Sequence, residues 1–186
     1  MNSFEALCYT SPVSSIKKED WLTCNRLNNN CLLHDFFNGD VDAIPSLEII
    51  AEGLLLPNKY GDTPLHHAAQ KDIEMVPQEL LTKKNLTTKN KDGVTPLHDA
   101  AQSGEIQFIP KELLNEEVLT MQDNDGETPL YHANENCNLD YLLGIEFSDA
   151  IVDEVGQEWF DRNNEVLARK MELVQDEVEV PTIDLF

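Results

Sequence analysis

Apolar pairs recur along the chain at a long, regular interval. The pairs are Ile49-Ile50, Leu80-Leu81 and Leu113-Leu114, and each is followed, five residues after its second member, by Leu55, Leu86 or Leu119. Trp21-Leu22, followed by Leu27, extends the pattern toward the N-terminus. Self-similarity with a period of roughly 20 to 50 residues is typical of repeat architectures. The pattern therefore predicts a row of similar units, each too small to bury its own apolar face.

A polar motif repeats in the same register. The segments Gly61–Ala69, Gly93–Ala101 and Gly126–Asn134 each contain Gly-x-Thr-Pro-Leu, and their threonines are 32 and 33 residues apart. Threonine can cap the start of a helix, and proline is tolerated at the first helical position. Glycine suits a tight turn before that helix. A fainter copy, from Cys31 to Asp40, lacks the threonine and the proline.

This motif and its period resemble the ankyrin repeat, whose core is Thr-Pro-Leu-His-x-Ala-Ala. The resemblance covers residues 30–147 and implies an all-α solenoid of stacked helix pairs joined by short finger turns. We expect four repeats, preceded by an N-terminal cap with a partial repeat and followed by a helical cap and an acidic tail. These segments are 1–29, then 30–57, 58–89, 90–122 and 123–147, and finally 148–175 and 176–186.

Recurring prolines depart from the family pattern. Pro45, Pro77 and Pro110 fall where the second ankyrin helix normally continues. A proline inside a helix costs on the order of 3 kcal/mol, so an unbroken helix is not expected. We expect instead short helices over Pro77–Leu81 and Pro110–Leu114.

The C-terminal segment has a helical pattern of its own. Ser148 can cap a helix, and apolar residues then recur three to four positions apart as far as Phe160. Asn163-Asn164 is expected to separate this helix from a second one. The segment would cover the last repeat as a cap, or bind a partner or a second copy. Beyond Asp176 we expect a disordered end, with a docking peptide as the alternative.

The chain is strongly acidic. Its 13 basic and 35 acidic residues give a net charge of −22, and residues 112–161 contain no Lys or Arg. Such a chain is a poor ligand for nucleic acids and anionic membranes, because phosphate contacts need cations. The acids are either a solvated surface or a face that meets a cationic partner. No signal peptide is visible and the four cysteines are irregularly spaced, so a cytoplasmic protein with free thiols is expected, although delivery into a host cell stays open.

The five histidines are not expected to bind metal. His34, His66 and His98 share one repeat position and are expected to hydrogen-bond backbone, whereas His67 and His132 follow them and are expected to face solvent. Equivalent positions in a solenoid are too far apart to share a zinc ion. No catalytic or phosphate-binding motif is present. We therefore expect no enzyme activity, no cofactor and no metal.

The ankyrin resemblance implies a protein-binding module that uses its finger tips and first helices. The matching positions here are Tyr60, Asp62, His67, Asp92, Val94, Asp99, Asn124, Asp125, Glu127, His132 and Glu135. Together with the charge, these predict an acidic inhibitor or antidote, of the immunity or antidefence type, that covers a basic and nucleic-acid-handling protein. Asp99, Asp125, Glu127 and Glu135 are expected to lie exposed on one face. The alternatives are an effector or scaffold that binds a host protein through the concave face, and a self-assembling structural protein; the partner and the oligomeric state stay open.

Overall fold

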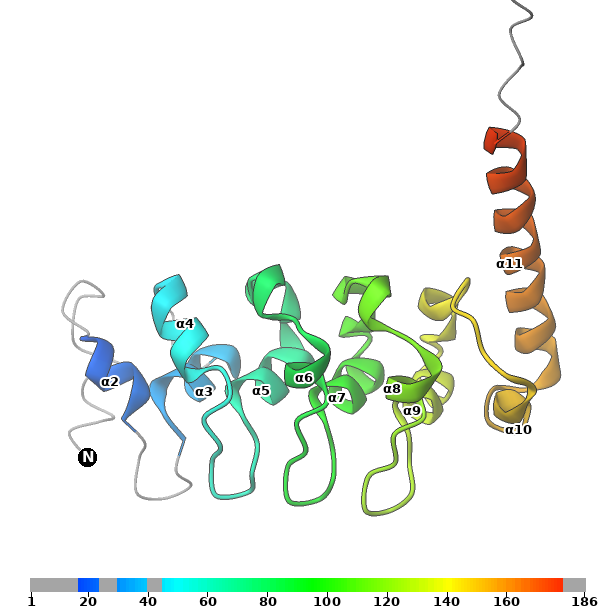
Figure 1. The fold of residues 1–186 in the computed structure, drawn as a ribbon. Coiled ribbons are helices and arrows are strands. Elements are labelled where there is room, and N and C mark those ends of the chain that lie inside the picture. The colour runs from blue at the N-terminus through cyan, green and yellow to red at the C-terminus, as the bar shows by residue number, and fades with distance from the viewer. Residues whose placement is uncertain (1–16, 24–29, 40–44, 179–186) are drawn as a thin grey trace, which may run out of the picture.

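The computed structural model describes residues 17–23, 30–39 and 45–178. Within these residues the elements are helices, with no β-strand. Four short helices follow one another in a row: α3 (Leu32–Phe37), α5 (Pro64–Lys71), α7 (Pro96–Ser103) and α9 (Pro129–Glu135). Finger-like loops extend from one side of this row and α4 (Leu47–Gly53) lies on the other, whereas α6 (Lys83–Leu86) and α8 (Glu116–Leu119) return to the level of the row (Figure 1). The expected all-α solenoid is thereby confirmed.

The repeated motif forms the start of each first helix. Thr95 and Thr128 cap α7 and α9, each accepting a hydrogen bond from the backbone N–H three residues later. Pro96 and Pro129 occupy the first helical position, where no backbone donor is needed. The leucine that follows, Leu97 or Leu130, is completely buried. Small alanines on the same helices are also fully buried, which allows neighbouring repeats to pack closely.

The second half of each central repeat is a series of short turns. The second repeat has 3₁₀ turns η2 (Ile73–Met75) and η3 (Gln78–Leu80) and then α6 (Lys83–Leu86). The third has η4 (Glu105–Phe108), η5 (Lys111–Leu113) and α8 (Glu116–Leu119), whereas the first has α4 (Leu47–Gly53) and the fourth has η6 (Leu139–Leu142). The predicted interruption of the second helix is thus confirmed. The short helices expected at Pro77 and Pro110 are 3₁₀ turns, and each begins one residue after its proline, whose ψ angle of 132° or 126° is not helical.

The fingers stack because two glycines leave room between them. Gly61 and Gly93 have φ angles of 86° and 79°. A Cβ on either glycine would lie 2.8 Å from the backbone nitrogen of the next finger, at Lys91 or Asn124. Those nitrogens donate hydrogen bonds to Tyr60 O and Asp92 O, at 3.0 and 2.9 Å. The tips of the second, third and fourth repeats therefore lie side by side.

Aromatic residues cover both ends of the stack. At the N-terminal end, Trp21 in α2 (Lys18–Leu22) is buried, and its ring meets Phe36 edge-on. At the C-terminal end come η7 (Asp149–Ile151), α10 (Val152–Val155) and α11 (Gln157–Val178), with Trp159 and Phe160 buried at the start of α11. The rest of α11 runs away from the stack on the side opposite the fingers (Figure 1).

Two expectations for the C-terminal segment are wrong. The helix expected from Ser148 to Phe160 is interrupted at Gly156, whose φ angle of 81° separates α10 from α11. Helix α11 does not break at Asn163-Asn164 but continues to Val178, so it also includes the first residues of the expected acidic tail. The reason is that Asn163 is completely buried and hydrogen-bonds the loop beneath the helix. Residues 179–186 lie outside the described residues, as do the N-terminal residues 1–16.

Candidate functional site

The expected binding residues lie on the finger tips and along the first helices. We call this surface the finger face, and define it by the residues predicted above other than Asp99. Tyr60 is 53% exposed. Asp92, Asn124, Asp125 and Glu135 are exposed, and Asp62, His67, Val94, Glu127 and His132 are intermediate. These residues are therefore accessible to differing degrees. The expectation that His67 and His132 face solvent is wrong, because Nε2 of His67 is buried and the His132 side chain is only 14% exposed.

Asp99 is the exception. Its exposed fraction is 6%, and Oδ1 accepts a hydrogen bond of 2.9 Å from Gln70 Nε2. Oδ2 is buried without a hydrogen-bond partner. Burial raises the pKa of this carboxyl to about 7, because the charged form is separated from water. The expectation that Asp99 stands on the exposed acidic face is therefore wrong; the side chain belongs to the interface between the second and third repeats.

Lysines on the finger side are held against backbone carbonyls. Lys91 Nζ donates to Lys59 O at 2.7 Å, and Lys71 Nζ donates to Asn38 O at 2.7 Å. Both contacts bridge neighbouring repeats and use part of the cation's hydrogen-bonding capacity. The fourth finger carries Asp123, Asp125 and Glu127 and has no lysine. The charge on and around the finger face therefore changes along the row, from mixed at the second and third fingers to acidic at the fourth.

Three buried histidines join the repeats, as the sequence predicts. The Nε2 atoms of His34, His66 and His98 lie 3.0, 3.2 and 3.3 Å from the backbone oxygens of Asp62, Val94 and Glu127. Burial lowers the pKa of His34 and His66 to about 4 and lowers that of His98 as well. These side chains are structural, and none is placed to act on a ligand at the finger tips.

Comparison with protein families agrees with this geometry. A family model described as ankyrin repeats (three copies) matches residues 32–109 and 78–149. The two matches together span more than half of the chain. This protein belongs to the ankyrin-repeat family. Such repeats are protein-interaction modules and are generally non-catalytic. This supports the expectation that the chain binds other proteins, without naming the partner.

A search of curated proteins found no match to this ankyrin-repeat protein. In the described part of the chain, no helix is both long enough and apolar enough to cross a membrane. Helix α11 has the length, but acidic and basic residues interrupt it throughout.

A stripe of exposed apolar side chains escaped the sequence analysis. Met75, Phe108 and Tyr141 occupy the same position in consecutive repeats and are 41%, 37% and 41% exposed. They lie in η2, η4 and η6, within the second halves of the repeats. Their regular spacing is visible in the sequence. It was missed because the neighbouring positions carry the stronger buried pattern.

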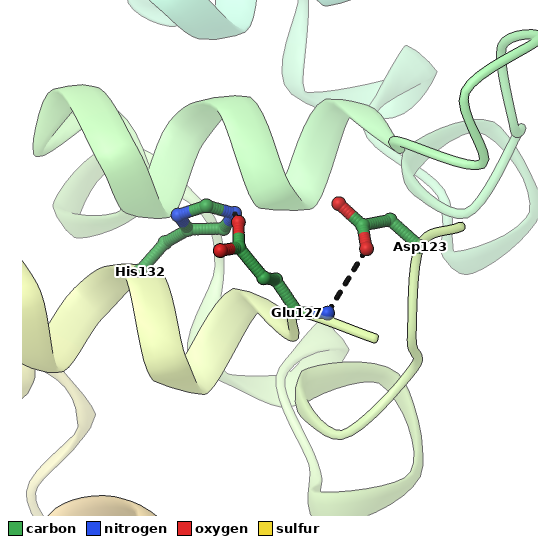
Figure 2. A group of neighbouring side chains, drawn as sticks. All are labelled: Asp123, Glu127 and His132. Atoms are coloured by element: carbon green, nitrogen blue, oxygen red, sulfur yellow. Dashed lines mark hydrogen bonds and ion pairs between the residues drawn. The ribbon is translucent and has the colours of Figure 1, made fainter. Parts of the chain in front are cut away.

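Asp123 is not among the residues predicted from the sequence. Glu127 and His132 are predicted singly, whereas the structure brings both together with Asp123 at the base of the fourth finger (Figure 2). The signal was available, because Asp123 replaces an asparagine that the second and third repeats carry at the same position, Asn58 and Asn90.

Proposed function

We propose that this ankyrin-repeat protein is a non-enzymatic inhibitor or antidote whose finger face covers a basic, nucleic-acid-handling protein. The observation that carries the proposal is the acidic end of that face. Asp125 and Glu135 are exposed there, and no base lies between residues 112 and 161. Clustered charges of one sign accelerate capture of an oppositely charged protein. An exposed thiol at Cys137 fits the reducing cytoplasm, where such a partner would be met.

The test uses the partner recovered by affinity capture from the native source. Asp92, Asp125 and Glu135 are changed together to Asn or Gln, because all three are exposed. Association with the partner should slow by at least about tenfold at low salt, and its dependence on ionic strength should flatten. Association kinetics by surface plasmon resonance measure both effects.

A matched control removes the same charge elsewhere. Glu74, Glu79 and Glu112 are exposed on the second halves of the repeats, opposite the fingers. Their replacement by Gln should change the association rate much less. If both triple variants associate like the unmodified protein, the acidic face is only a solubilising surface. A scaffold that binds through neutral finger residues such as Tyr60 and Val94 would then be the better description.

A further inference from the structure

At the base of the fourth finger, three potential metal ligands converge. Asp123, Glu127 and His132 each offer one ligand atom, and these atoms lie within 4.8 Å of one another (Figure 2). His132 Nε2 and Glu127 Oε2 are 3.5 Å apart. Ligands that share a divalent ion about 2.1 Å from each lie roughly 3 to 4 Å apart. One pair therefore already has the required spacing, and the remaining separations, at most 4.8 Å, exceed it by about 1 Å.

Two of the three side chains are held in place. Asp123 Oδ1 accepts hydrogen bonds of 2.9 Å from Asp125 N and Glu127 N, which orient the carboxylate. The His132 side chain is 14% exposed, and its ring meets those of His98 and Tyr131. Glu127, at 44% exposure, can adjust to close the site. Partly preformed ligands lower the ordering cost of binding an ion.

Comparison of the repeats shows that the finger turn itself does not require this carboxylate. Asn90 forms the same turn in the third repeat, accepting from Asp92 N and Val94 N at 3.0 Å. Its amide also donates to Asp62 Oδ1 at 2.7 Å, a bond that a carboxylate cannot make. The third repeat has Val94 and Asp99 where the fourth has Glu127 and His132. The full ligand set is thus a property of the fourth repeat and is not needed for the fold of a finger.

We propose that Asp123, Glu127 and His132 form a divalent metal site. One imidazole nitrogen and two carboxylate oxygens suit Zn²⁺, Co²⁺ or Mn²⁺, with water completing the coordination. A bound ion would tie the base of the fourth finger to helix α9 and neutralise part of the acidic end of the finger face. The proposal differs from the sequence-based expectation of no metal, and it is independent of the identity of any protein partner.

The test measures Co²⁺ binding by calorimetry and by visible absorption, after chelator treatment and dialysis of the full chain. Asp123→Asn retains the oxygen that accepts the two turn hydrogen bonds but removes the charged ligand. This variant and His132→Asn should each bind Co²⁺ at least about tenfold more weakly than the unmodified protein. Asp125→Asn removes the same charge two residues away, at a side chain that is not a proposed ligand. This control should bind Co²⁺ with the affinity of the unmodified protein. Binding to cysteine thiols would be common to all four proteins and would cancel in the comparison.

A second readout follows the ligand itself. Addition of Zn²⁺ should shift the NMR signals of the His132 imidazole and raise the melting temperature, since an ion that binds only the folded state stabilises it. Asp123→Asn should abolish both effects at the same Zn²⁺ concentration. Equal Co²⁺ affinity in all variants, or unchanged His132 signals at saturating Zn²⁺, would overturn the proposal.

Discussion

The buried histidines show how one side chain can satisfy two repeats. His66 Nδ1 accepts from the backbone N–H of Thr63 at 3.1 Å, while Nε2 lies 3.2 Å from Val94 O in the next repeat. Only the neutral ring with its proton on Nε2 can accept at Nδ1 and donate at Nε2. His34 and His98 repeat the arrangement with Cys31 and Thr95. The connection between repeats therefore depends on imidazole staying uncharged.

We accordingly predict that His34 and His66 remain neutral Nε2–H tautomers at pH 5. Their folded pKa of about 4 lies below the unfolded value near 6.5, so the unfolded chain binds more protons between these limits. Their contribution to stability is complete above pH 6.5 and is lost as the pH falls toward 4. Two-dimensional ¹⁵N NMR of the rings reports tautomer and charge directly. Protonation of either ring by pH 6 would contradict the prediction.

The contribution of Asp99 to stability depends on pH in the opposite direction from that of the histidines. Its pKa is raised from 3.8 to about 7 by burial, so the folded state favours the protonated carboxyl. Stability from this group is therefore present at low pH and is lost as the pH rises through 7. Asp99→Asn keeps an oxygen for Gln70 and removes the buried charge. We expect it to raise the free energy of unfolding at pH 8 by on the order of 1 kcal/mol, and by much less near pH 4.

Urea titrations at the two pH values measure this difference. Asp92→Asn is the matched control, because Asp92 is exposed at a finger tip in the same repeat. Its stability should stay close to that of the unmodified protein at both values. A loss of stability in Asp99→Asn at pH 8 would show that the carboxylate is stabilising there.

At the scale of elements, the repeat motif predicted most of the fold. Thr, Pro and Leu at fixed spacing specify cap, first turn and core contact together, so α5, α7 and α9 begin where the sequence indicates. The prolines correctly indicated a broken second helix. The burial of Asp99 could not be predicted, because it depends on how the neighbouring helix α5 packs against it. The gathering of Asp123 with Glu127 and His132 did leave a signal, since Asp123 stands where the second and third repeats have asparagine. The continuity of α11 also depends on packing, because the Asn163 side chain, which the sequence suggests would break the helix, instead anchors it to Gly144 and Ile145.

We predict that Asn163→Ala loosens α11 from the stack. Its amide accepts from Gly144 N at 2.6 Å and donates to Ile145 O at 2.9 Å. Removal of the amide leaves both backbone groups without this partner, at a cost of about 1 to 3 kcal/mol for each buried group. Hydrogen exchange should accelerate at Trp159 and Phe160, with a lower urea midpoint. Asn164→Ala, at the exposed neighbouring position, should change neither quantity.

At the scale of the molecule, repulsion between like charges is only weakly offset by ion pairs. The structure pairs Lys18 with Glu48 and Glu52, and Lys83 with Glu117, but these side chains are largely exposed. Such pairs contribute little to stability. A net charge of −22 is therefore expected to oppose the compact state. Because a solenoid holds each repeat only to its neighbours, this repulsion acts along the row without a shared central core to oppose it.

The chain should for this reason become more stable as salt is added at neutral pH. Raising NaCl from about 0.01 M to about 0.1 M shortens the screening length from about 30 Å to about 10 Å, which weakens repulsion between repeats. The urea midpoint at pH 7 should rise over this range. At a pH close to the isoelectric point of about 4.3, net repulsion between like charges disappears. The rise of the urea midpoint with added salt should then shrink or reverse. A midpoint that falls with salt at pH 7 would mean that the few ion pairs, rather than the excess acids, dominate the electrostatics of the fold.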